Sequence, residues 1–230
     1  MSGILTIIPV PLDEIRNGDC LAKLISYKIK LENNDVIVIT QKIVSKAENR
    51  LLRVDSDQDI QKAIESESEI ILRRRGQLVI SQTHHGFVCA NAGIDQSNVE
   101  KGYIALLPKD PDLSARRIRQ YIKGVDKINV GVIISDTFGR PWRQGAVDVA
   151  IGCAGIGAIL DLKGTKDSFG KTIKSSEICI ADEIASAAEL VMGKSSSIPV
   201  AVIRGIDARW MRNSSIKEEV IRPYQQDLFR

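Results

Sequence analysis

The sequence lacks the residues of a typical zinc or iron–sulfur centre. It has only two histidines, adjacent at His84-His85, and its four cysteines lie far apart without a CxxC pair. Such centres use several imidazole or thiolate ligands, so they are excluded and the cysteines are predicted to be structural thiols. Any metal must therefore be held by oxygen ligands, which favours magnesium, manganese or calcium.

Long apolar runs and blocks of like charge are also absent. The apolar run at residues 4–12 contains two prolines, and no basic segment precedes it, which argues against a membrane helix or a signal peptide. The chain has 32 basic and 29 acidic residues, and its densest basic run is Arg73-Arg74-Arg75. Polyanion binders carry larger basic clusters. We therefore predict a cytoplasmic protein that binds neither membranes nor nucleic acid.

The common signatures of nucleotide-binding proteins and hydrolases are missing as well. No GxxxxGK[ST] segment, no GxGxxG after a predicted strand and no GxSxG segment occurs in the chain. A P-loop, a dinucleotide-binding turn and a nucleophile elbow are therefore excluded. Any nucleotide site must be built differently.

Apolar periodicity predicts a mixed α+β fold with flanking helices, in one domain over residues 1–230. Several neighbouring strands have no helix between them, which argues against a doubly wound sheet. If two subdomains exist, they must be interwoven, because no linker divides the chain. Residues 41–49 fit either a loop or a short helix. We expect strands over residues 4–10, 35–40, 78–81, 86–89, 103–107, 129–135, 147–151, 156–162, 172–180 and 199–204, and helices over residues 18–29, 57–74, 111–122 and 181–192.

Asp136 and Thr137 form the first candidate site. They follow the apolar strand predicted over residues 129–135, and ligand-binding groups often lie where buried strands end. A carboxylate and a hydroxyl suit a phosphate-bound divalent cation, and Arg140 and Arg143 could neutralise phosphate oxygens. The alternative is an aspartate that turns the chain, with both arginines exposed to solvent.

Two further segments are candidates. Residues 91–98, NAGIDQSN, are dense in amide and carboxylate oxygens and lie beside predicted strands. They could line a cleft or simply form a turn stabilised by Asn and Asp side chains. Residues 40–48 carry Lys42 and Lys46, which could contact phosphates or lie exposed on a helix.

Six segments in order resemble the coenzyme F420:L-glutamate ligase family. They are TQKIVSKAENR, HGFVCANAGIDQSNV, LLPKDPDLSARRIR, VGVIISDTFGRPWRQG, ADEIASAAELVMGK and IPVAVIRG, and the likeness extends from residue 4 to about residue 206. The resemblance implies an intertwined homodimer without an appended reductase-like domain. It also implies a ligase that adds L-glutamate through a gamma-linkage to a phospholactyl deazaflavin precursor. The ligase would use GTP, two Mg²⁺ or Mn²⁺ ions per site and possible K⁺. The reaction would pass through an acyl phosphate, without a covalent enzyme nucleophile.

The resemblance also implies roles for particular residues. Asp95, Asp136 and Thr137 correspond to metal ligands. The nucleotide-binding positions are Pro11, Leu12, Asp13, Glu14, Gln41, Lys46, Asn98, Leu190, Val191, Met192, Gly193, Lys194, Ser195, Ser196 and Ser197.

Two segments depart from the family pattern. The first loop lacks a glycine before Leu12, and Lys194 to Ser197 replace an acidic, glycine-rich stretch. Two other functions stay open: an amide ligase for another phosphorylated carboxylate, and a GTP-binding protein without turnover.

Overall fold

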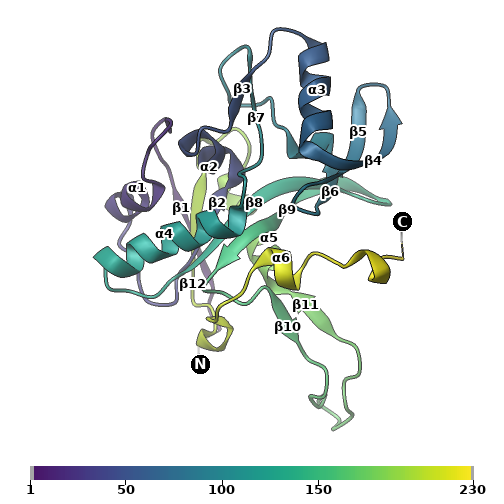
Figure 1. Cartoon of the computed structure of the whole chain (residues 1–230). Helices are drawn as coiled ribbons and strands as arrows, with labels where there is room; N and C mark the ends of the chain where they lie inside the picture. The colour runs from purple at the N-terminus through teal and green to yellow at the C-terminus, as the bar shows by residue number, and fades with distance from the viewer. Residues whose placement is uncertain (1–2, 229–230) are drawn as a thin grey trace.

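The centre of the protein is a five-stranded mixed sheet. A computed structural model describes residues 3–228, and Figure 1 shows the arrangement of its elements. The sheet order is β1-β12-β2-β8-β9, and β2 and β8 are parallel whereas the other neighbours are antiparallel. The strands are β1 (Thr6–Val10), β12 (Val200–Arg204), β2 (Val36–Thr40), β8 (Gly131–Arg140) and β9 (Arg143–Ala154).

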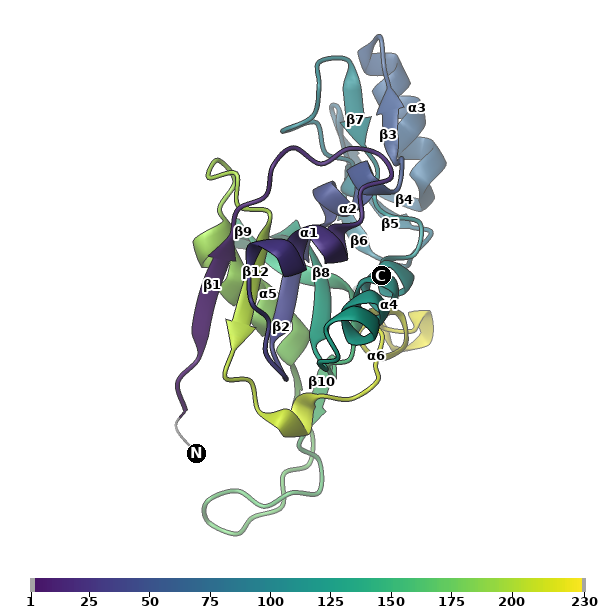
Figure 2. The same ribbon diagram turned by 90° about the vertical axis from the view of Figure 1, so that its left-hand side faces the viewer.

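Helices cover both faces of this sheet. Successive side chains of a strand point to opposite faces, so Ile37 packs with α1 (Leu21–Lys28) and α4 (Pro111–Val125), whereas Val38 packs with α5 (Ile180–Met192). Figure 2 shows α1 and α4 on the opposite side of the sheet from α5. Burial on both faces explains why β2 is a continuous apolar run.

Two of the smaller sheets are built by the part of the chain between α2 (Gln41–Ala47) and α4. They occupy the top of Figure 1, next to α3. The elements are β3 (Leu51–Arg53) paired with β7 (Tyr103–Ala105), α3 (Asp57–Glu67), and the sheet β4 (Ser68–Arg75), β5 (Leu78–Thr83) and β6 (Val88–Ala90).

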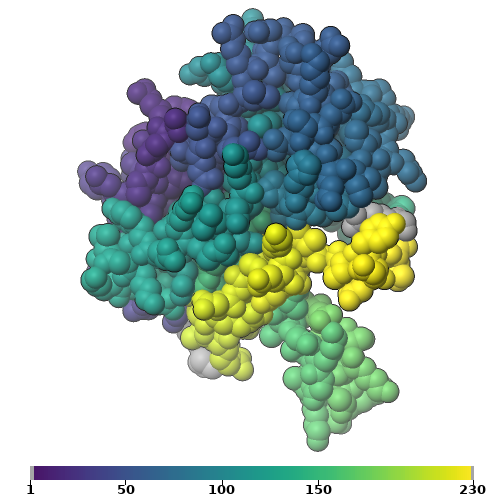
Figure 3. Space-filling model, in the orientation of Figure 1, coloured from purple at the N-terminus to yellow at the C-terminus, as the bar shows by residue number. Residues whose placement is uncertain are grey.

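An arm projects from the opposite end of the molecule. Strands β10 (Ile159–Asp161) and β11 (Glu177–Cys179) pair at its base, and Figure 3 shows it standing clear of the body. Phe169, in the loop that joins the two strands, is 94% exposed. The short elements that remain are η1 (Asn91–Gly93), η2 (Ala208–Trp210), α6 (Ile216–Glu219) and η3 (Tyr224–Gln226).

The prediction of an α+β fold is confirmed, but three of the predicted elements are wrong. The helix expected over residues 57–74 ends at Glu67, and β4 follows it and pairs with β5 across a turn at residues 76–77. The strand expected over residues 172–180 shrinks to β11. The strand expected to end before Asp136 continues to Arg140, because β9 pairs with its extension.

The four cysteines are free thiols. Burial raises the pKa of Cys89, Cys153 and Cys179 to about 12, so these three stay protonated and packed. Cys20 is exposed. Across residues 3–228, every helix is too short or too polar to cross a bilayer.

Candidate active site

A cavity of about 590 Å³ lies at the carboxyl end of the parallel pair β2 and β8. The last pair in their register is Thr40 with Ser135. Beyond it, the first strand turns into α2, whereas β8 continues through Asp136 and Thr137. Ligand-binding groups of mixed and parallel sheets commonly gather at this edge. The topology therefore explains why Thr40, Asp136 and Thr137 line one cavity although they are distant in sequence.

The β8–β9 ladder fixes one wall of the cavity. Thr137 lies opposite Asp148 in the register, and its hydroxyl donates to Asp148 Oδ1 at 2.6 Å. The hydroxyl of buried Ser135 donates to the other oxygen of Asp148 at 3.0 Å. Because the Thr137 hydroxyl has one proton, this bond leaves its oxygen lone pairs available to the cavity.

Asp136 carries the most perturbed carboxyl of the site. Burial raises its pKa to about 7, and the negative charges of Asp95 and Asp148 add to the effect, against the Thr137 N–H and the positive charge of Lys194. Asp95 and Asp136 thus lie near enough to repel each other, and both line the cavity. The structure thus brings together at one cavity the two aspartates that the sequence analysis named as metal ligands.

The loop after η1 brings Asp95 to the opposite wall. Its backbone N–H and C=O bond to Ala105 of β7, at 2.9 and 2.8 Å. Its carboxylate accepts from the Ser97 N–H and hydroxyl at 2.7 and 2.8 Å, and forms an ion pair with Lys42 at 2.8 Å. Burial acts to raise the pKa of Asp95, but the bonds from Lys42 and Ser97 outweigh it and hold this pKa below its usual range.

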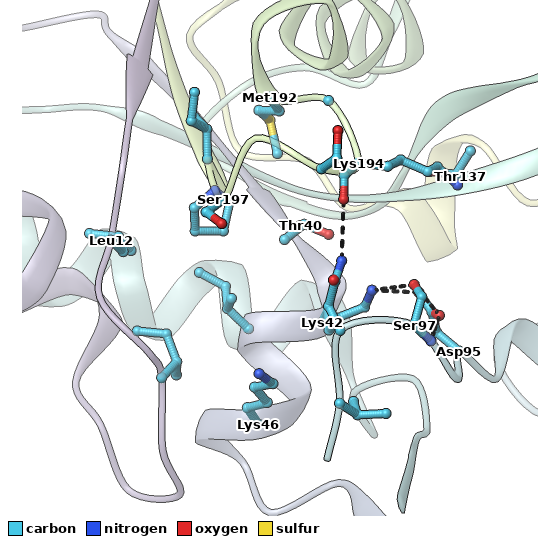
Figure 4. Close-up of a pocket in the computed structure, with 18 of the residues that line it drawn as sticks. Leu12, Thr40, Lys42, Lys46, Asp95, Ser97, Thr137, Met192, Lys194 and Ser197 are labelled. Atoms are coloured by element: carbon cyan, nitrogen blue, oxygen red, sulfur yellow. Dashed lines mark hydrogen bonds and ion pairs between the residues drawn. The ribbon is translucent and has the colours of Figure 1, made fainter. Parts of the chain in front are cut away.

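A second loop, residues 193–197, closes the cavity after α5. The Asn98 side-chain amide donates to the Lys194 carbonyl at 3.3 Å and so joins the two loops, as the dashed line to Lys194 in Figure 4 shows. Asn98 and Ser197 both have positive φ, 52° and 55°. Such backbone conformations are uncommon outside glycine and tend to occur where a site requires them.

The N-terminal loop and α2 provide another part of the lining. Leu12, Asp13 and Glu14 reach the cavity, and Lys46 on α2 forms an ion pair with Glu14 at 2.5 Å. Lys42 lies one helical turn before Lys46, and both line the cavity. Residues spaced by four lie on the same face of a helix, so the cavity receives two ammonium groups from one short helix.

The structure therefore gathers most of the residues predicted from the sequence. Those that line the cavity are Leu12, Asp13, Glu14, Lys46, Asp95, Asn98, Asp136, Thr137, Met192, Gly193, Lys194, Ser195 and Ser197.

Five predicted nucleotide-binding residues lie off the lining, namely Pro11, Gln41, Leu190, Val191 and Ser196. Gln41 is buried, and its oxygen accepts from the Ser45 hydroxyl. Leu190 is 83% exposed. The Ser196 hydroxyl donates to the Met192 carbonyl.

The two arginines considered for phosphate neutralisation, Arg140 and Arg143, do not line the cavity. The Arg140 guanidinium donates to the carbonyls of Gln144 and Gly145 in its own hairpin and does not line the cavity. The cations that do line the cavity are the lysines at positions 42, 46 and 194.

Four charged lining residues were missed as site residues, namely Lys42, Glu100, Asp148 and Glu189. Asp148 is brought to Thr137 only by the antiparallel pairing of β8 and β9, and Glu189 lies on α5 one turn before Gly193. Burial and the charge of Asp148 raise the pKa of Glu189. Lys42 was considered in the sequence only as one of two lysines in residues 40–48 and was not assigned to the site. Its four-residue spacing from Lys46 would have indicated that both lysines lie on the same face of a helix.

A large cavity that combines carboxylates of shifted pKa with lysines is the arrangement of an enzyme site for charged substrates. Within residues 3–228, no three His, Cys, Asp or Glu side chains lie together in a group that could hold a metal ion. The fold and cavity thus define the class of protein, an enzyme with an acidic site at the edge of a mixed sheet.

The chain belongs to the F420-0:Gamma-glutamyl ligase family, whose model matches residues 9–205. It is 39% identical to the coenzyme F420:L-glutamate ligase of Methanopyrus kandleri over 100% of both chains. It is 40% identical to the protein of that name from Methanothermobacter thermautotrophicus, over 93% of each chain. For the Methanocaldococcus jannaschii protein of that name, the identity is 42% over 87% of this chain and 86% of the relative.

Proposed function

We propose that the protein is a GTP- and divalent-metal-dependent ligase. It adds L-glutamate through a gamma-linkage to the phospholactyl deazaflavin precursor of coenzyme F420. Membership of the family and the names of its relatives support the ligase and its substrates. The charge of the cavity lining supports the use of a nucleotide together with cations.

The charge of the cavity is the observation on which this proposal depends. Its lining has seven acidic side chains and only three lysines. A triphosphate entering such a cavity would meet net repulsion unless cations accompanied it. Divalent cations bound by the carboxylates would reverse that repulsion and bridge phosphate oxygens to the wall. The acidic residues are Asp13, Glu14, Asp95, Glu100, Asp136, Asp148 and Glu189.

The donors at the cavity fit Mg²⁺ or Mn²⁺. Asp95 and Asp136 provide carboxylate oxygens, and Thr137 provides a hydroxyl whose proton already points to Asp148. These hard oxygen donors are the type that both ions prefer. Burial raises the pKa of Asp136, and the negative charges of Asp95 and Asp148 add to this effect, so a cation at this carboxylate would be favourable. Bound there, two such ions would neutralise charge on the triphosphate. We include K⁺ as a possible third ion.

In the proposed reaction, a carboxylate oxygen of the deazaflavin precursor attacks the γ-phosphorus of GTP, GDP leaves, and an acyl phosphate forms. The amine of L-glutamate then attacks the acyl carbon, loses a proton and expels phosphate. The chain's contribution is positioning and charge neutralisation. Lys46 and Lys194 supply positive charge beside the acidic wall. A covalent nucleophile of the enzyme is not required, because the phosphoryl group activates the carboxylate directly.

The decisive test is a product-mass assay with the deazaflavin precursor, L-glutamate and Mg²⁺, comparing GTP with ATP. We expect a mass gain of one glutamyl unit that requires GTP and disappears with a chelator. Labelling the precursor carboxylate with ¹⁸O should place one ¹⁸O in the released phosphate, because the acyl phosphate keeps that oxygen. Glutamate added to a different acceptor would favour another amide ligase, and GTP binding without phosphate release would favour a non-catalytic protein.

We further propose a cytoplasmic homodimer. The projecting arm supports the dimer, because a solitary hairpin with an exposed aromatic residue at its loop gains stability by packing against another chain. Phe169 is that residue. Light scattering should give twice the chain mass, and Phe169→Asp should lower it. A monomeric mass for the unaltered protein would contradict the dimer.

A further inference from the structure

Lys42 stands out because its ammonium forms an ion pair with Asp95, a carboxylate that the proposed site assigns to metal binding. Its ammonium lies 2.8 Å from Asp95 Oδ2 and 2.9 Å from the Ser97 hydroxyl, and Figure 4 shows these contacts at the edge of the cavity. The Lys42 side chain is 13% exposed, against 32% for Asp95. The pair is therefore shielded from water more than most surface ion pairs, and screening weakens it less.

A cation bound to Asp95 would compete directly with this ammonium. Two positive charges on one carboxylate repel each other, and each would lose part of its counter-charge. Lysine has a flexible four-carbon stem and acts as a point charge without fixed geometry, so its ammonium can leave Asp95 without moving α2. Its new counter-charge must lie in the same cavity, which Lys42 itself lines.

The neighbouring lysine, Lys46, provides a comparison for Lys42. Lys46 lies on the same face of α2 and also reaches the cavity, but its partner Glu14 is not one of the proposed metal ligands. The two lysines therefore differ in one respect that matters: only Lys42 bonds a carboxylate that a metal ion would use.

We propose that Lys42 is a placeholder cation, which neutralises Asp95 before the metal arrives and then moves to a phosphate oxygen of the bound nucleoside triphosphate. This inference rests on the proposed function, since it needs both a divalent cation and a triphosphate in the cavity. Lys42 would thus couple the binding of the metal ion to the binding of the nucleotide. The metal ion releases the lysine from Asp95, and the released lysine then strengthens the binding of the phosphate.

A purely structural Lys42 predicts something different. If the ion pair only holds residues 95–98 in place, removing the ammonium loosens Asp95 and weakens the binding of metal and of nucleotide alike. The placeholder role predicts opposite changes, because loss of the competing ammonium favours the metal while loss of a phosphate contact disfavours the nucleotide. The sign of the change in metal affinity separates the two.

The test uses Lys42→Met, with Lys46→Met as the matched control. Mn²⁺ binding is measured without nucleotide, from the electron paramagnetic resonance signal of free Mn²⁺, and GTP binding is measured calorimetrically in saturating Mn²⁺. For Lys42→Met we expect Mn²⁺ to bind about fivefold more tightly and GTP about tenfold more weakly. For Lys46→Met we expect the same loss for GTP, with Mn²⁺ affinity changed by less than about twofold.

Equal or weaker Mn²⁺ binding by a folded Lys42→Met protein would overturn the placeholder role and leave the proposed function standing. If the unaltered chain binds neither Mn²⁺ nor GTP, both proposals fail together. Thermal unfolding checks that each variant is folded. Should Lys42→Met not fold, Lys42→Gln must show the same two opposite signs.

Discussion

The two sides of the cavity are built in different ways. The sheet wall, consisting of Asp136, Thr137 and Asp148, lies on paired strands β8 and β9, where the register fixes each side chain. The loop wall, consisting of residues 95–98 and 193–197, depends on a few contacts, among them Lys42 with Asp95 and Asn98 with the Lys194 carbonyl. Sites on strands are held more accurately than sites on loops. We therefore assign charge placement to the sheet wall and closure around substrate to the loop wall.

The largest effect should come from the sheet wall. Asp136→Asn removes the charge of a proposed metal ligand while keeping its shape, and we expect turnover to fall at least ~1,000-fold, the upper range for loss of a group that stabilises charge in the transition state. The product-mass assay with GTP measures it, and circular dichroism controls for folding. Near-normal turnover by the folded variant would remove Asp136 from the mechanism.

The walls should also respond oppositely to pH. The carboxyl pKa of Asp136 is about 7 in the fold and near 4 in an unfolded chain. Between these values the folded state binds more protons, so the metal-free protein loses stability as pH rises through this window. Above pH 7, Asp136→Asn should raise the free energy of unfolding by about 2 kcal/mol, half the full value because water reaches the cavity.

Asp95→Asn is the matched comparison for that experiment. The pKa of Asp95 is lowered in the fold, so its stabilisation is present above the unfolded pKa and is lost as pH falls through the lower, folded value. The variant should therefore be less stable at neutral pH, in contrast to Asp136→Asn. Denaturant unfolding in the presence of a chelator measures both. Changes of the same sign would mean that the walls do not differ in charge balance.

A smaller effect is expected at the residue that orients Thr137. Asp148 accepts a hydrogen bond from the Thr137 hydroxyl, and outer partners of metal ligands typically contribute ~10–100-fold to affinity. We expect Asp148→Asn to weaken Mn²⁺ binding about tenfold. Ser135→Ala removes the other hydroxyl bond to Asp148 without touching Thr137, so it should change the affinity much less. Equal losses would show that Asp148 acts only through general packing.

The smallest effect should come from the loop wall. Asn98→Gly removes the bond to the Lys194 carbonyl but tolerates the positive φ of 52° at this position. We expect KM for GTP to rise about threefold with kcat little changed, in line with one neutral hydrogen bond. Asn98→Ala adds backbone strain and should be the worse of the two. A large fall in kcat for Asn98→Gly would place Asn98 in the chemical step.

The sequence predicts local features of this fold well. Residues 36–40 and 131–135 are buried on both faces, so their continuous apolar runs indicated strands. Asp110 caps α4 by accepting from the Leu113 N–H, with Pro111 in the first turn, and both residue types favour these positions. These features depend only on neighbours along the chain.

Features that depend on pairing could not be predicted in the same way. Strand β4 was predicted as the end of a helix. Most of its side chains are exposed and its last three residues are arginines, so its sequence lacks the alternation of apolar and polar residues that indicates a strand. Asp148 meets Thr137 through the antiparallel register, which no spacing in the sequence reveals. Asp95 and Asp136 were linked by the family resemblance, and the cavity shared by both aspartates confirms their proximity.

The most direct test of the central claim is the affinity for GTP with and without a divalent cation. The lining has more than twice as many acidic side chains as lysines, so the triphosphate should bind only in company with cations. In calorimetry we predict GTP to bind at least ~100-fold more tightly in Mg²⁺ than in chelator, a coupling within the usual range for linked ligands. Equal affinity in both solutions would contradict the account.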